Sequence, residues 1–161
     1  MKTDTVSKNE LEGLGGWLVL VGLGMVLSLV QMLAEFRIYF EVFSQGAWEL
    51  LATPGSPAYN PLWAPILIGE MAINFALFLS WIFIVFLFFS KKKLFPKWYV
   101  GILLFTFVFI LVDALIIKSV MSDDPIFDPE TKMKLFRTLI AILIWGPYMR
   151  LSKRVKATFV K

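Results

Sequence analysis

The sequence predicts an all-α integral membrane protein, built as a bundle of four transmembrane helices. Of its 161 residues, 58% are hydrophobic, whereas a typical soluble domain is about 45–50% apolar, and the mean hydropathy is +0.75. The apolar residues gather in four runs that suit a helix crossing a bilayer, which needs about 20 residues. The runs lack the alternation of a strand, and a helix satisfies its own backbone hydrogen bonds in lipid. We therefore expect a single transmembrane domain over residues 1–161.

The four spans are expected at residues 15–34, 62–89, 98–117 and 134–148. The first run is longer than the roughly 7–15 apolar residues of a signal peptide, and acidic residues precede it, so we expect a retained helix. The last helix is expected to start outside the membrane, because Asp128, Pro129 and Glu130 supply an N-cap, a first-turn proline and an acidic first turn. Gly146 and Pro147 are expected to kink or end it.

Two amphipathic segments follow spans. The polar residues that recur at every fourth position between residues 35 and 52 are Arg37, Glu41, Gln45 and Glu49. This spacing places them on one face, which predicts an amphipathic helix on the outer membrane surface or a continuation of the first span. Residues 149–161 combine basic side chains with apolar ones at helical spacing, which predicts a basic helix on the inner surface.

The basic residues also predict the orientation. Eleven Lys and Arg lie in the N-terminal leader, in the link between the second and third spans and in the tail, whereas five lie near the other two connections. Because basic loops remain cytoplasmic, both termini are expected in the cytoplasm. The residues expected to contact lipid headgroups of an anionic inner leaflet are Lys91, Lys92, Lys93, Arg150, Lys153, Arg154 and Lys156.

Two passages resemble a known family. "GLGGWLVLVGLG" (residues 13–24) opens the first span, and "WGPYMRLSKRVKATFV" (residues 145–160) closes the chain. Together they are similar to the bacterial membrane family catalogued as domain of unknown function 2569, and the resemblance covers nearly the whole chain. It implies a small protein of the bacterial inner (cytoplasmic) membrane without an established activity, and it brings no catalytic residues to this sequence.

Polar residues from all four spans fall in the outer half of the membrane under this topology. They are Gln31, Glu70, Asn74, Asp113 and Arg137. Carboxylates are costly in hydrocarbon, so their shared depth predicts one polar cluster. One interpretation is a structural network in which Arg137 bridges Glu70 or Asp113. The other is a proton or ligand site that opens to the outside through an exchangeable Glu70.

Small residues at four-residue spacing allow close helix packing. They are Ala72, Ala76 and Ser80 on the second span, with Gly24 and Ser28 on the first. They suit packing within one bundle, or an interface with a partner or a second copy.

The sequence contains no Cys and no His. Imidazole and thiolate metal sites and His-based catalytic triads are therefore excluded, and we expect no cofactor, metal or nucleic-acid partner. The function expected first is that of a non-enzymatic accessory or scaffold component of a membrane assembly, with a membrane-protein partner or as a homo-oligomer. The alternatives are an oligomeric solute or proton-coupled transporter that uses Glu70 and Asp113, and a lipid-modifying membrane enzyme.

Overall fold

The computed structural model describes residues 12–121 and 125–161, and every regular element in these ranges is a helix. The helices are α2 (Trp17–Ser44), α3 (Ala47–Ala52), α4 (Trp63–Phe89), α5 (Phe95–Val120), α6 (Pro129–Leu151) and α7 (Lys153–Thr158). Within these ranges, three helices are long and apolar enough to cross a membrane, namely α2, α4 and α5. The all-α membrane class is therefore confirmed, with three spans identified by length and composition.

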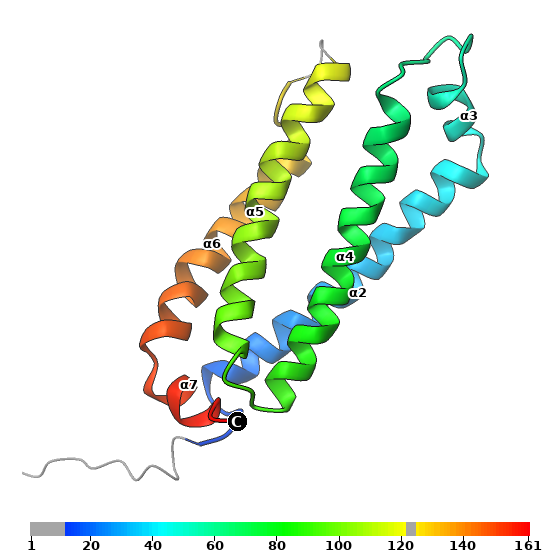
Figure 1. The fold of residues 1–161 in the computed structure, drawn as a ribbon. Helices are drawn as coiled ribbons and strands as arrows, with labels where there is room; N and C mark the ends of the chain where they lie inside the picture. Colours follow the sequence, from blue (N-terminus) through cyan, green and yellow to red (C-terminus); the bar gives the residue numbers. More distant parts are fainter. Residues whose placement is uncertain (1–11, 122–124) are drawn as a thin grey trace, which may run out of the picture.

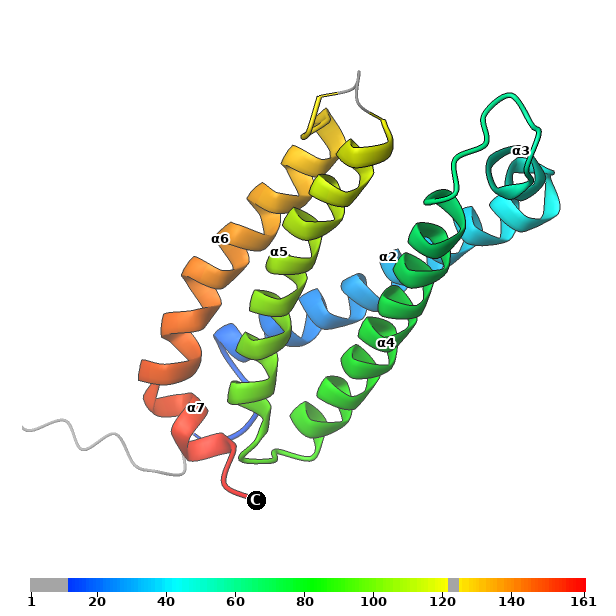
Figure 2. The same ribbon diagram turned by 45° about the horizontal axis from the view of Figure 1, so that its top comes forward.

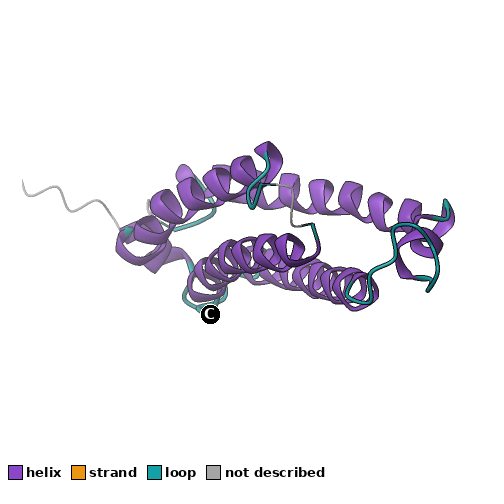
Figure 3. Cartoon of the chain, turned by 90° about the horizontal axis from the view of Figure 1, so that it is seen from above, coloured by secondary structure: helices purple, strands orange, loops and turns teal. Residues whose placement is uncertain are grey.

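The long helices pack as two pairs. α2 lies against α4 and α5 lies against α6, while α4 and α5 join the pairs (Figure 1). The short helices α3 and α7 mark opposite ends of the molecule, which we call the α3 end and the α7 end. Figure 2 shows α4 and α5 close together at the α7 end and diverging toward the α3 end. The view from above in Figure 3 contains only helices and their connections.

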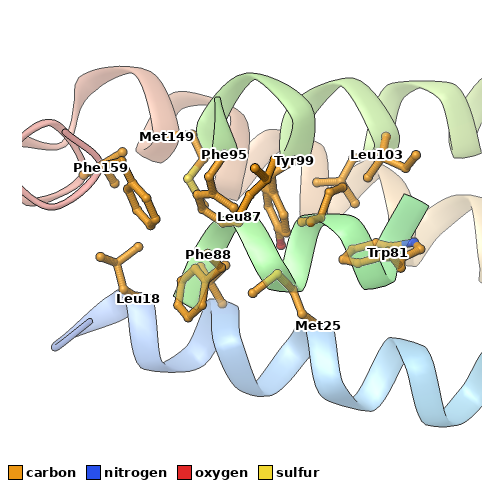
Figure 4. Packing of buried hydrophobic residues seen from close by; sticks show 14 of the residues in the cluster. Leu18, Met25, Trp81, Leu87, Phe88, Phe95, Tyr99, Leu103, Met149 and Phe159 are labelled. Atoms are coloured by element: carbon orange, nitrogen blue, oxygen red, sulfur yellow. The ribbon is translucent and has the colours of Figure 1, made fainter. Parts of the chain in front are cut away.

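The buried core lies toward the α7 end. It gathers side chains from α2, α4, α5, α6 and the tail, several of which face one another in Figure 4. Phe95 is fully buried, and its ring centroid lies 4.5 Å from that of Phe159 and 5.0 Å from that of Phe88. Aromatic rings at these distances bury large apolar areas and gain specific ring contacts.

The tail belongs to this core, and a single helix over residues 149–161 does not form; its location at the inner membrane surface stays a prediction. α6 continues through Gly146 and Pro147 to Leu151, and the Ser152 hydroxyl accepts a hydrogen bond from the backbone N–H of Val155 to start α7. Val155 and Phe159 are 1% and 6% exposed. The apolar face of the tail therefore packs against protein, because the break before α7 turns it inward.

Backbone hydrogen bonds fasten the tail. The Lys93 N–H donates to the Lys161 carbonyl at 2.7 Å, and the Lys161 N–H donates to the Lys91 carbonyl at 3.3 Å. The Thr158 hydroxyl lies 3.1 Å from both the amide nitrogen and the carbonyl oxygen of Gly13, accepting from the former and donating to the latter. The tail thus connects the start of the first span to the α4–α5 turn.

A single amphipathic helix over residues 35–52 does not form either. α2 runs on to Ser44, which confirms the alternative of a continued first span for the first part of the segment. Gly46 then adopts φ 77°, a left-handed conformation that favours glycine, and the six-residue α3 follows. The apolar side of the extension packs on α4, where the Phe36 ring contacts those of Phe75 and Phe78 at 6.2 and 5.6 Å.

The start of α6 agrees with the sequence. Asp128 is the N-cap, its carboxylate accepts a 2.6 Å hydrogen bond from the Thr131 N–H, and Pro129 begins the helix. This backbone hydrogen bond lowers the pKa of Asp128 below its usual value, because it stabilises the charged form.

Candidate functional site

The centre of the polar cluster is a hydrogen-bonded group on α2 and α4. The Tyr39 hydroxyl donates to Glu70 Oε1 at 3.0 Å and accepts from Asn74 Nδ2 at 2.8 Å. Asn74 Nδ2 also donates to the Glu70 carbonyl oxygen one turn earlier, at 3.0 Å. Since the tyrosine is at once donor and acceptor, it links the two α4 side chains into one unit and ties them to α2.

Aromatic packing sets the position of Tyr39. Phe36 lies one turn before it on α2, and its ring contacts those of Phe75 and Phe78, which follow Asn74 on α4. These ring contacts set the register of α2 against α4. A void of about 10 Å³ beside Tyr39 and Asn74 is near the lower limit for one water molecule.

The second part of the cluster lies on α5 and α6. The charges of Asp113 and Glu70 act on each other, and the charge of Lys134 acts on both and on Glu35. Lys134 also forms a 2.9 Å salt bridge with Glu130 within α6. The cluster therefore combines the carboxylates of Glu70 and Asp113 with one ammonium group, which is also paired with Glu130, so the cluster is acidic whenever both carboxylates are ionised.

The structure thus brings together Glu70, Asn74 and Asp113 of the predicted set. Gln31 and Arg137 lie outside it, with exposed side chains. The predicted bridge from Arg137 is wrong: within the part of the chain that the structure describes, the salt bridges between described residues are Arg37–Glu41 and Lys134–Glu130. Lys134, one turn earlier on α6, takes the place expected for Arg137.

Sequence reasoning missed Tyr39 and Lys134. Tyr39 lies in the segment expected as a helix on the membrane surface, so that expectation gives no contact between Tyr39 and α4. The available signal was the alternative of a continued first span, which would have brought a tyrosine beside α4. Lys134 stands at the expected boundary of the fourth span, where a lysine is ordinarily taken as a headgroup anchor.

All five members of the cluster are partly exposed. Tyr39, Glu70, Asn74, Asp113 and Lys134 each have intermediate side-chain exposure. Four of them stand on the three apolar helices that are able to cross a membrane. Partly exposed carboxylates on such helices require polar surroundings, because hydrocarbon excludes them.

The predicted small residues divide between two surfaces. Ala76 and Ser80 line a groove between α4 and α5, whereas Ala72 is exposed. Gly24 has open space where a Cβ would stand, so it makes no close packing contact within this chain. The close approach of α2 to α4 occurs instead at Gly22, where a Cβ would lie 3.2 Å from the Phe88 ring. Ser28 donates to the Gly24 carbonyl within α2.

The basic residues expected at headgroups gather at the α7 end. Lys92, Lys93, Arg150, Lys153 and Lys156 are exposed, and Lys91 is partly exposed. Arg154 lies against the start of α2, where its Nη1 is 3.1 Å from the place of a Cβ on Gly15. Their contact with lipid stays a prediction.

Within the described ranges, no group of three or more acidic side chains lies close enough together to hold a metal ion.

Comparison with known proteins places this architecture in a family. The family model described as "Protein of unknown function (DUF2569)" matches residues 11–160. The chain belongs to this family. It is 27% identical over 149 residues to the inner membrane protein YdgK of Escherichia coli (strain K12), covering 91% of this chain and 93% of the relative. No solved structure matches the chain.

The match confirms the resemblance carried by the opening and closing passages. The relative is an inner membrane protein, and α2, α4 and α5 of this chain are long and apolar enough to span a bilayer, so comparison and structure agree on a membrane protein. Neither comparison assigns chemistry to the polar cluster.

Proposed function

We propose that this protein is a non-enzymatic accessory component of an inner-membrane assembly, and that its partner covers the polar cluster. The observation that carries the proposal is the partial exposure of Glu70 and Asp113 on helices that are otherwise apolar. A carboxylate on a bilayer-spanning helix costs up to about 3 kcal/mol in lipid, the value at the helix centre. A polar group from another chain that faces these carboxylates removes that cost.

The proposal includes a topology of four spans with both termini in the cytoplasm. α6 has 23 residues, about 34 Å of helix, and lies along α5 (Figure 1). The exposed basic residues named above lie at the α7 end, which fits a cytoplasmic location for that end. The polar cluster then lies in the outer half of the membrane.

Charge indicates the partner's chemistry. Lys134 forms its salt bridge with Glu130, and although its charge acts on Glu70 and Asp113, neither carboxylate forms a salt bridge within the described ranges. A transmembrane helix that carries a Lys, Arg or amide side chain at this depth would complement them. The pairs α2–α4 and α5–α6 diverge toward the α3 end (Figure 2), and both carboxylates are partly exposed, which supports contact with a group from outside the chain.

Site-directed photocrosslinking in native membranes tests the proposal. Ile116 is 43% exposed and lies three residues after Asp113 on α5, so a benzoylphenylalanine placed there faces the expected partner. Leu104, 47% exposed and further toward the α7 end of α5, is the matched control. We expect one stoichiometric protein adduct from position 116, weakened by Glu70→Gln with Asp113→Asn, and none from position 104. Adducts with the protein itself alone, or with lipid alone, would refute the hetero-assembly.

The same exposure supports a second candidate, a proton-coupled or solute transporter in which water reaches the carboxylates from the α3 end. Reconstituted vesicles distinguish it. A transporter would show a pH-dependent flux that Glu70→Gln abolishes without unfolding the protein. An accessory component would show no flux, whether the wild type or the Glu70→Gln variant is reconstituted.

A further inference from the structure

A second surface, separate from the polar cluster, is an open groove between α4 and α5. Its volume is about 510 Å³, within the range of roughly 300–1,000 Å³ that is usual for ligand pockets. Ala76 and Ser80 form part of its α4 wall, and Lys97, Trp98 and Gly101 part of its α5 wall.

Small residues create the groove and leave it apolar. A Cβ added to Gly101 would meet no atom within 4 Å, so the space in front of it is open. The Ser80 hydroxyl donates to the Ala76 carbonyl at 2.8 Å, and its hydrogen is thereby used within α4. The walls therefore offer van der Waals contact along most of the groove, which favours an apolar ligand.

One end of the groove is different. Lys97 lies near the start of α5, is exposed and makes no salt bridge with any residue that the structure describes. Beside it Trp98 is 46% exposed and packs edge-on against Phe83 at 5.6 Å between ring centroids. An exposed lysine next to an exposed tryptophan is typical of the level where lipid headgroups meet hydrocarbon.

We propose that this groove binds one glycerophospholipid with an anionic headgroup, with its phosphate at Lys97 and an acyl chain between α4 and α5. The groove's α5 wall extends from Lys97 to Phe105, eight residues or about 12 Å of helix, which is most of the roughly 15 Å hydrocarbon depth of one leaflet. Lys91, Lys92 and Lys93 in the adjoining α4–α5 turn add positive charge at the same end, so the headgroup end complements an anion.

Native mass spectrometry of the full chain in detergent tests the site, with phosphatidylglycerol and phosphatidylcholine titrated as separate probes. Gly101→Leu fills the groove and raises helix propensity, so the variant keeps its fold. Gly24→Leu is the matched control, because that glycine also faces open space but lies on α2. Lys97→Gln removes the charge and leaves the apolar walls intact.

We expect wild type and Gly24→Leu to bind one phosphatidylglycerol with equal affinity, and Gly101→Leu to bind it at least about tenfold more weakly. Lys97→Gln should lose about fivefold in affinity for phosphatidylglycerol and keep that for phosphatidylcholine. Equal binding by Gly101→Leu and wild type would overturn the proposal. So would equal binding of the two lipids by wild type, or a photocrosslink from position 76 to a protein helix in native membranes.

Discussion

The two ends of this bundle differ in the polarity and burial of their side chains. At the α7 end, rings of Phe88, Phe95 and Phe159 meet in a buried core that α2, α4, α5, α6 and the tail all share. Toward the α3 end, a tyrosine, an asparagine and two carboxylates lie partly exposed, where α4 and α5 diverge.

The difference shows where the fold is held and where it is available for binding. Apolar packing at the α7 end fixes the helices to one another. The polar contacts between helices in membranes add little, about 0.6 kcal/mol each. The polar end therefore depends on the apolar end for its geometry, and its side chains can be changed at small cost in stability.

The largest effect is expected from the core. Phe95→Ala removes a fully buried ring and should lower the free energy of unfolding by about 3–5 kcal/mol. Unfolding with increasing SDS in mixed micelles measures this change. Phe86→Ala, at a ring that is 57% exposed, is the control and should change stability little. Equal effects at the two positions would show that the α7 end is not the stabilising core.

The tail provides the next largest effect. Thr158→Val keeps the shape of a side chain that is 2% exposed but leaves the Gly13 N–H and carbonyl without their partner, which costs about 1–3 kcal/mol. The same unfolding measurement applies. Thr138→Val removes a hydroxyl bonded only to its own helix and should be close to neutral. A neutral Thr158→Val would mean that the tail is fastened by its apolar side chains alone.

A smaller effect is expected at the start of α6. Asp128→Ala removes the N-cap and should cost about 1 kcal/mol at pH 7. The folded state lowers the pKa of Asp128, so its stabilisation is present above the unfolded value near 3.9 and is lost as the pH falls through the lower folded value. The difference in stability between wild type and Asp128→Ala should therefore shrink below about pH 4.

Thermal unfolding followed by circular dichroism at several pH values checks this sign. Asp128→Asn supplies a cap that does not titrate, so its stability relative to Asp128→Ala should not follow this transition. A wild-type advantage that grows on acidification would contradict the role of the carboxylate.

The smallest effect belongs to the polar end. Tyr39→Phe removes the hydrogen bonds to Glu70 and Asn74, and a double-mutant cycle with Glu70→Gln should give a coupling of about 0.6 kcal/mol. A coupling as large as the effect of Phe95→Ala would contradict the conclusion that the polar end adds little to stability. The proposed partner crosslink at position 116 should respond to the polar variants far more strongly than stability does.

The sequence predicted the positions of the helices better than the contacts that their side chains make. Long apolar runs located α4 and α5 to within a few residues, and the Asp128-Pro129-Glu130 pattern located the start of α6, because both signals are local. The four-residue spacing of Glu70 and Asn74 also placed them correctly on one face.

Other features depended on tertiary contacts. The amphipathic pattern after residue 35 fits a surface helix and an extended span equally well, and only the seating of Phe36 on α4 decides between them. Val155 and Phe159 show helical spacing whether they face lipid or protein. Arg137 and Lys134 lie one turn apart on α6, so their charges alone did not reveal which one faces Asp113.

The hydrogen bonds between Gly13 and Thr158 join residues 145 positions apart, on either side of every long helix. They can form only after the intervening helices have come together. Insertion of individual helices and closure of the bundle are thus separate steps in biogenesis, as in two-stage assembly. Until that last step, the phenylalanines of the α7 end lack their full enclosure, so an incompletely assembled chain exposes apolar surface that is buried in the closed bundle.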